Sequence, residues 1–168
     1  MIAAPRLIGR SEVLAALDEV ADPEIPNVSV VELGMIGEIA FDDDLIAVEV
    51  LPTFVGCPAL EVIRDTVAAR LAEFGRPVRV DVSFATPWST ERISPAGREK
   101  LRQSGFAPPP TAPLGRALPM LDLAAAPVAC PYCGSLQTTL ESAFGPTQCR
   151  SIRHCAACGQ PFEAFKPV

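Results

Sequence analysis

The sequence lacks an excess of positive charge and lacks any long apolar run. Its 168 residues include 14 lysines and arginines against 20 acidic residues, which gives a net charge of -6. A basic surface for nucleic acid or for an anionic membrane is therefore not expected. No stretch approaches the roughly 18 apolar residues of a membrane span, and the N-terminal residues do not have the pattern of a secretory signal. We expect a cytoplasmic protein that binds neither nucleic acid nor a membrane.

Histidine is nearly absent, whereas cysteine is not. His154 is the only histidine, and the chain has six cysteines. Since no histidine lies in the first two thirds of the chain, a cysteine–histidine nucleophile is not expected there. In a reducing compartment, cysteines serve more often as metal ligands or reactive thiols than as disulfide partners.

The hydrophobic pattern of residues 1–105 predicts a small α+β sandwich domain with the order helix, strand, strand, helix, strand. Apolar residues three and four apart predict a first helix, which Ser11 can cap and which must end before Pro23. Two β-like runs, 35–41 and 45–51, flank an acidic turn. They predict an antiparallel hairpin.

A second helix is predicted from Pro58, which suits the first helical position, to about residue 74. Strict alternation over residues 78–84 predicts a half-buried strand. A right-handed crossover would place this strand parallel to one strand of the hairpin. Ser94 and Pro95 then have the pattern of a cap and first residue of a short basic helix.

Residues 106–127 separate this domain from a cysteine-rich C-terminus. Six of these 22 residues are proline, a density typical of an extended, semi-rigid linker. We therefore predict three parts: an α+β domain over residues 1–105, a linker over 106–127 and a small module over 128–168.

The C-terminal module contains two Cys-x-x-Cys-Gly motifs, with the cysteines at Cys130, Cys133, Cys155 and Cys158. Two intervening residues let both sulfurs of a motif approach one ion, and the glycine lets backbone N–H groups face the thiolates. Four cysteines complete a tetrahedral shell, so we predict a structural zinc ribbon that is unfolded without its metal. A redox pair or a disulfide pair is the alternative, disfavoured by the surroundings and the compartment.

Cys149 and His154 leave the ligand count open, because either could replace a cysteine in the zinc shell. We interpret His154 as a residue near the shell or on the surface. Cys149 is interpreted as an extra free thiol near the zinc site, with a buried structural cysteine as the alternative.

Cys57 stands apart from the other cysteines, between Gly56 and Pro58. At the expected start of a helix, the partial positive charge would lower the thiol pKa and favour the thiolate. A thiolate can bind a metal or attack an electrophile. The alternative is a small buried residue at a junction between a strand and a helix.

A proline-rich acidic loop over residues 22–34 offers three carboxylates, Asp22, Glu24 and Glu32. Carboxylates and a thiolate on neighbouring loops can form an iron site, although acids in such loops are usually only solvated.

Several motifs together carry a family resemblance. The runs DPEIP (22–26), VELG (31–34) and T-x-x-G-C-P (53–58) resemble the signature of the small domain of cytosolic iron–sulfur assembly factors, once called domain of unknown function 59. The runs PWST (87–90), FAPP (106–109) and F-G-x-T-x-C (144–149) resemble one branch, the D subunits of bacterial phenylacetyl-CoA oxygenases, which are 1,2-epoxidases. The resemblance covers nearly the whole chain in the same order.

The resemblance implies a non-catalytic accessory subunit in phenylacetate catabolism that helps to assemble metal centres. Its partners would be the di-iron and reductase components of the oxygenase. Cys57 would be the functional thiol, with Asp22 and Glu24 beside it, and iron or an iron–sulfur cluster would bind transiently. One thiol is too few for a cluster, so a homodimer or a further thiol would have to complete it.

Two other functions stay open at this level. The chain could be a structural adaptor that holds oxygenase subunits together. It could also be a thiol-dependent enzyme that uses Cys57 as the nucleophile.

Overall fold

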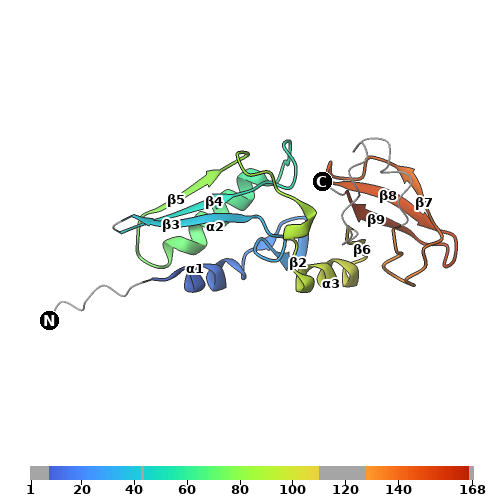
Figure 1. The fold of residues 1–168 in the computed structure, drawn as a ribbon, viewed down its shortest axis with the longest axis horizontal. Coiled ribbons are helices and arrows are strands. Elements are labelled where there is room, and N and C mark those ends of the chain that lie inside the picture. The colour runs from blue at the N-terminus through green and yellow to red at the C-terminus, as the bar shows by residue number, and fades with distance from the viewer. Residues whose placement is uncertain (1–7, 43, 110–127, 167–168) are drawn as a thin grey trace.

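The computed structural model describes residues 8–42, 44–109 and 128–166, and it contains an α+β part and a C-terminal ribbon. The two parts lie side by side along the long axis of the molecule (Figure 1). Both predicted architectures are confirmed. The helices are α1 (Arg10–Leu17), α2 (Leu60–Ala72) and α3 (Pro95–Gln103), with a short 3-10 helix η1 (Thr90–Arg92). The strands are β1 (Ala21–Asp22), β2 (Ile25–Ser29), β3 (Ile36–Asp42), β4 (Leu45–Val50), β5 (Val78–Val82), β6 (Phe106–Ala107), β7 (Thr138–Ser142), β8 (Arg150–Cys155) and β9 (Pro161–Phe165).

The central sheet has the order β3-β4-β5. β3 and β4 form the expected antiparallel hairpin, in which Ile39 pairs with Val48. β5 runs parallel to β4, with Val48 paired to Val80, so the predicted crossover is confirmed. α2 provides that crossover and covers one face of the sheet through Ile63, Val67 and Leu71, all of which are buried.

The first helix starts earlier than the sequence predicts, and the assignment of Ser11 as its cap is wrong. Gly9 is the N-cap, and the Glu12 side chain accepts a hydrogen bond from the Gly9 backbone N–H at 2.9 Å. This bond replaces a side-chain cap and places Ser11 inside the first turn. The helix ends at Leu17, well before Pro23.

The second helix starts later than predicted, at Leu60 with Ala59 as its N-cap. Cys57 lies before the helix, in a turn where its N–H donates to the Phe54 carbonyl at 3.2 Å. Pro58 is therefore not the first helical residue. The thiol is displaced from the helix N-terminus on which its expected low pKa depended.

The third helix agrees with its sequence signal. The Ser94 hydroxyl accepts a hydrogen bond from the Gly97 N–H at 2.9 Å, and Pro95 opens the helix. A Cβ at Gly97 would lie 2.7 Å from the Glu32 carbonyl oxygen, so only glycine allows this close approach to the acidic loop. Leu101 is fully buried on the same helix.

The ribbon sheet has the order β6-β9-β8-β7. β6 comes from the segment that we assigned to the linker, and its pairing with β9 connects the α+β part directly to the ribbon sheet. Residues 110–127 of the linker lie outside the described residues, so the three-part division stays a prediction.

The two parts share buried surface. Phe165 at the end of β9 is 4% exposed and belongs to the core of the α+β part, whereas Phe162 on the same strand lies in the small ribbon core. Phe106 and Cys149 also pack against the larger core. The ribbon is therefore packed onto the α+β part.

In the described segments the longest helix, α2, has 13 residues, and none of the helices there has both the length and the apolar character of a membrane span.

Candidate metal centres

The four ribbon cysteines converge in space as their spacing predicts. The Sγ atoms of Cys130 and Cys158 are 3.7 Å apart, and those of Cys133 and Cys155 are 3.6 Å apart. All four sulfurs lie within 4.8 Å of one another. Zn–S bonds of about 2.3 Å in a tetrahedron place sulfurs roughly 3.8 Å apart. The donor set and its spacing therefore fit zinc.

Each motif closes as a tight turn around its sulfurs. The Gly134 N–H donates to the Cys130 carbonyl at 2.9 Å, and the Gly159 N–H donates to the Cys155 carbonyl at 2.8 Å. Both glycines have positive φ angles, 75° and 72°, which side chains disfavour. When bound, zinc would neutralise the four thiolates and hold the two turns together, which is a structural role.

Neither of the two ambiguous residues joins this group. His154 lies on β8 opposite Thr139, and within the described ranges the converging set consists of the four cysteines alone. Cys149 precedes β8 at the end opposite Cys155. The expectation that Cys149 lies near the zinc site is therefore wrong, since it packs instead against the core of the α+β part.

The acidic loop folds into a small hairpin, β1 and β2, that sequence periodicity did not reveal. Asp22 Oδ1 accepts hydrogen bonds from the backbone N–H groups of Glu24 at 2.8 Å and Ile25 at 3.0 Å. Burial raises the pKa of the Asp22 carboxyl, and these two hydrogen bonds oppose the rise. Asp22 thus fixes the turn that carries Glu24.

Glu24 lies beside a buried arginine of the ribbon. Its Oε2 accepts from Arg150 at 3.0 Å, and the same guanidinium lies 2.9 Å from Glu163 Oε2 and 5.0 Å from the centre of the Phe106 ring. The Arg150 side chain is only 6% exposed. A buried arginine between two carboxylates is strongly held in place, since removal of one partner leaves the others uncompensated. The sequence gives no local signal for this contact, because Glu24 lies 126 positions away from Arg150.

Glu32 has a structural role instead of joining the other two acids. It is buried, and its Oε2 accepts from the Ser29 N–H at 3.0 Å. Its Oε1 lies 2.7 Å from Lys100 Nζ on α3. The carboxylate therefore ties the acidic loop to α3.

Cys57 is half-buried, and its thiol has properties opposite to those predicted. Burial raises the pKa of the thiol above its usual value, and a hydrogen bond from the Ala59 backbone only partly opposes this. The negative charges of Asp22 and Glu24 raise the pKa further. Because Cys57 precedes the helix and faces acids, the thiol, not the thiolate, is favoured in the free protein.

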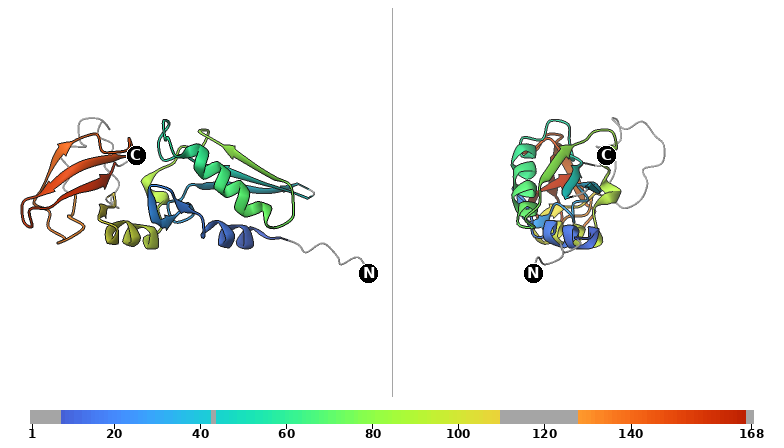
Figure 2. Two further views of the ribbon diagram at one scale, coloured as in Figure 1. Left: turned by 180° about the vertical axis from the view of Figure 1, so that it is seen from behind. Right: turned by 90° about the vertical axis from the view of Figure 1, so that its left-hand side faces the viewer.

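Cys57, Cys149 and the acidic hairpin come from three segments that meet where the ribbon packs onto the α+β part. The loop of residues 53–57 lies next to the ribbon in opposite views of the molecule (Figures 1 and 2). At this boundary Gly56, next to Cys57, lies against the side chain of Gln148, next to Cys149, and Arg150 donates to Glu24 at 3.0 Å.

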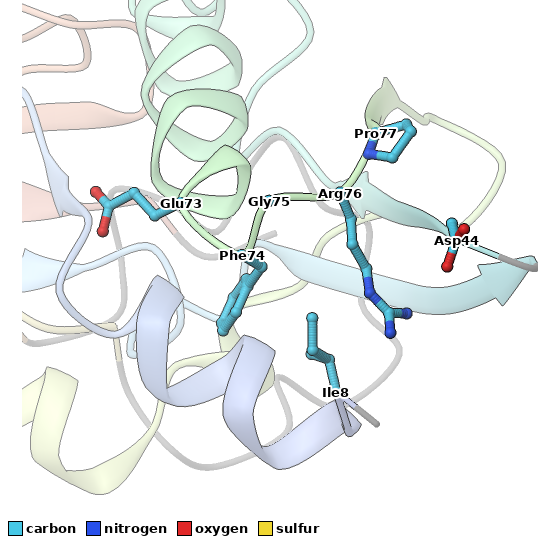
Figure 3. A pocket seen from close by; sticks show the side chains of 7 residues that line it. All are labelled: Ile8, Asp44, Glu73, Phe74, Gly75, Arg76 and Pro77. Carbon is cyan, nitrogen blue, oxygen red and sulfur yellow. The ribbon is translucent and has the colours of Figure 1, made fainter. Parts of the chain in front are cut away.

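The hollow shown in Figure 3 lies at the other end of α2, where Phe74, Arg76 and Ile8 line a space of about 440 Å³. The Arg76 side chain extends between Ile8 and Asp44. No cysteine or histidine is among its described lining residues. The hollow is thus separate from both groups of thiols.

Comparisons with known proteins agree with this two-part structure. Residues 10–84 match the family model of an iron–sulfur cluster assembly protein, and residues 117–166 match that of the PaaD zinc beta ribbon domain. The D subunit of the putative 1,2-phenylacetyl-CoA epoxidase of Escherichia coli K12 is 34% identical over 158 residues, which cover 94% of this chain and 92% of the relative. This chain belongs to the PaaD-like family. The resemblance inferred from the motifs is confirmed.

Two further relatives match the α+β part of this PaaD-like chain. The Fe-S protein maturation auxiliary factor YitW of Bacillus subtilis is 30% identical over 88 residues, covering 51% of this chain and 85% of the relative. A crystal structure of a domain of unknown function, DUF59, from Bacillus anthracis has a TM-score of 0.51 and 28% identity, covering 54% of this chain and 89% of that one. The PaaD-like chain is therefore homologous both to the D subunit of an epoxidase and to an Fe–S maturation factor.

Proposed function

We propose that this PaaD-like chain is a non-catalytic accessory subunit of a multicomponent oxygenase that epoxidises the ring of phenylacetyl-CoA, and that it helps to assemble a metal or iron–sulfur centre in that enzyme. Iron or a cluster would be its cargo, bound transiently through Cys57. The observation that carries the proposal is the match of residues 10–84 to iron–sulfur cluster assembly proteins. The raised pKa of Cys57, caused by burial and further by the charges of Asp22 and Glu24, supports it.

The raised thiol pKa fits cargo binding better than covalent catalysis. A nucleophilic cysteine needs a lowered pKa or an adjacent base, whereas burial and carboxylates raise the pKa of Cys57. A metal ion supplies its own positive charge and displaces the thiol proton when it binds. The same acids that disfavour a free thiolate therefore favour a thiolate paired with a cation.

The expected partners follow from the similarity to the D subunit of an epoxidase. We propose that the chain contacts the di-iron and reductase components in the cytoplasm, without nucleic acid or a membrane, and that a homodimer can form. Val55 and Phe144 are 79% and 75% exposed, and large apolar side chains of this exposure suit contact with another protein. The same exposure favours the second candidate function, a structural adaptor.

Metal analysis of anaerobically purified protein tests the proposal. Wild type, Cys57→Ser, Asp22→Asn and the control Asp81→Asn would be produced in iron-replete cells, and zinc, iron and sulfide would be measured per chain. Asp81 is an exposed carboxylate on β5 that pairs with Arg79. We expect one zinc in every protein, iron in the wild type and in the control, and no iron in Cys57→Ser.

Oxygenase activity in cells separates this function from the adaptor. Loss of activity in cells that carry Cys57→Ser supports cargo handling. Full activity with that variant, together with no iron in the wild type, would support the adaptor instead.

A further inference from the structure

Two contacts between the ribbon and the α+β part lie on either side of Cys149. The side chain of Gln148 lies against Gly56, where a Cβ would be 3.4 Å from Gln148 Oε1. The Arg150 guanidinium donates to Glu24 at 3.0 Å. Gly56 adjoins Cys57, so Cys149 lies between a residue that contacts the thiol loop and a residue that contacts the acidic hairpin.

Cys149 is also held firmly at this position. The Lys166 N–H donates to its carbonyl at 2.9 Å, and Lys166 Nζ donates to the Gln148 carbonyl at 2.8 Å. The Cys149 Sγ lies 3.2 Å from Thr147 Oγ1, and the side chain is half-buried against the core of the α+β part. The end of β9 thus anchors the backbone on which this thiol is carried.

We infer that Cys57 and Cys149 form one two-thiol site that binds a thiophilic divalent metal ion such as Fe²⁺, with a carboxylate of the acidic hairpin as a further ligand. The inference rests on the proposed function and deepens it, because it supplies the thiol that a single Cys57 lacks. Two thiolates and a carboxylate form a mixed soft and hard donor set suited to iron. Both cysteines would lose their protons when the ion binds.

The site differs from the zinc site in being incompletely assembled. Among the described residues, the ribbon cysteines are the one set of three or more potential ligands whose donor atoms already lie within 4.8 Å of one another. Asp22 and Glu24 are engaged by backbone N–H groups and by Arg150. A metal must therefore compete with existing contacts, which favours weak, reversible binding as a carrier requires.

Ferrous ion binding to the full chain with zinc in its ribbon tests the inference. Under anaerobic conditions, Fe²⁺ affinity would be measured by equilibrium dialysis for wild type, Cys57→Ser, Cys149→Ser and the double variant. We expect one Fe²⁺ per chain in the wild type. Removal of a residue that only hydrogen-bonds to a metal ligand weakens metal affinity about 10- to 100-fold. Since each single variant removes a ligand itself, its Fe²⁺ affinity should fall at least roughly tenfold. The double variant should bind no better than either single variant.

Two readouts besides affinity bear on the same inference. Residue-resolved alkylation should show that Fe²⁺ protects both Cys57 and Cys149 in the wild type, and that Cys149→Ser abolishes the protection of Cys57. Without iron, dibromobimane should link the two cysteines, each thiolate displacing one bromide. The control His154→Gln, on β8 in the same ribbon, should behave like the wild type in both assays.

The outcomes separate this inference from the proposed function. Unchanged Fe²⁺ affinity in Cys149→Ser, with loss in Cys57→Ser, overturns the two-thiol site and leaves the function of Cys57 intact. No Fe²⁺ binding by the wild type overturns both. Zinc content of one per chain in each variant, and the same result with Cys149→Ala, show that a loss of affinity is not a loss of ribbon fold.

Discussion

The four-cysteine group and the region around Cys57 present the same donor atom in opposite ways. The ribbon gathers four sulfurs from two tight turns in one small module, with the backbone N–H of Ser135 directed at Cys133 and that of Gln160 at Cys158. Cys57 instead lies on a loop of the α+β part whose Gly56 contacts Gln148 of the ribbon, and burial and the charges of Asp22 and Glu24 raise its pKa. The comparison shows that the groups around a cysteine decide whether it belongs to a closed structural metal site or remains a free thiol in an open one.

The difference has an electrostatic cause. Backbone N–H groups around the ribbon sulfurs favour thiolates, whereas burial and the neighbouring cysteines raise the pKa of Cys133 and raise that of Cys158 to about 12, so a resident cation is needed to hold four thiolates together. Around Cys57, burial and carboxylates keep the thiol protonated until a cation arrives. A protonated thiol also resists oxidation, because the thiolate is the reactive form.

Removal of one ribbon cysteine should have the largest effect. Cys155→Ser breaks the zinc shell, and because structural zinc contributes about 10–16 kcal/mol of apparent binding free energy in small zinc modules, the ribbon should unfold. Zinc analysis and amide NMR spectra would show the loss of zinc and of dispersed signals from residues 128–166. Cys149→Ser is the matched control and should keep one zinc. A folded, zinc-loaded Cys155→Ser protein would contradict the four-cysteine assignment.

Removal of the buried arginine that joins the two regions should have the next largest effect. Arg150→Met leaves Glu24 and Glu163 without their shared cation, which should lower the free energy of unfolding by about 3–5 kcal/mol. Urea unfolding followed by the fluorescence of Trp88, the single tryptophan, measures this.

Arg64→Met provides the comparison, since its ion pairs with Glu61 and Asp65 lie on the surface of α2. The free energy of unfolding of that variant should fall by no more than about 1 kcal/mol. Equal losses in the free energy of unfolding of Arg150→Met and Arg64→Met would show that the ion pairs of Arg150 do not stabilise the packing of the ribbon against the α+β part.

The pH dependence of Cys57 alkylation should distinguish its thiol from an ordinary one. Because the folded-state pKa lies above the usual value, the rate at neutral pH should be low and should rise about tenfold per pH unit up to that pKa. Iodoacetamide labelling of the zinc-loaded protein, with mass spectrometry of the Cys57 peptide, gives the profile. An unfolded peptide that contains Cys57 and its neighbours in sequence provides the control. If the alkylation rate of the folded protein rose at a lower pH than that of the peptide, the raised pKa would be contradicted.

Neutralising one nearby carboxylate should have the smallest effect. Asp22→Asn keeps the Oδ1 atom that accepts from the Glu24 and Ile25 N–H groups and removes a negative charge that raises the Cys57 pKa. The Cys57 pKa should fall, and its alkylation rate at pH 7.5 should rise roughly two- to threefold. The control Asp81→Asn should leave the rate unchanged. Slower alkylation in Asp22→Asn would contradict the conclusion that the Asp22 charge raises the pKa of Cys57.

Some of the fold could be predicted because its signals are local. The β3–β4 hairpin, the parallel β5 strand and the Ser94 cap follow from periodicity, crossover handedness and capping chemistry. The start of α2 could not be predicted in this way. A turn at Cys57 and Pro58 has nearly the same local signal as a first helical turn, and only packing decides between them.

The candidate site shows the same limit. Sequence motifs indicated Cys57, Asp22 and Glu24, but the pKa of Cys57 depends on burial and on charges that other segments bring near it. Arg150 carries no local signal at all, because its role depends on contact with Glu24 across the interface. Glu32 appeared equivalent to the other acids until the structure placed Lys100 against it.

The sequence by itself determined the zinc ribbon, the α+β class and the family, because ligand spacing, periodicity and short motifs are written along the chain. Only the tertiary structure decided that Cys149 lies away from the zinc site and packs, like Cys57, against the core of the α+β part. The physical reason is that the two thiols belong to segments far apart in the chain. Packing of Phe165 and Arg150 against the α+β part, and no property of residues near Cys149 in sequence, brings these segments together.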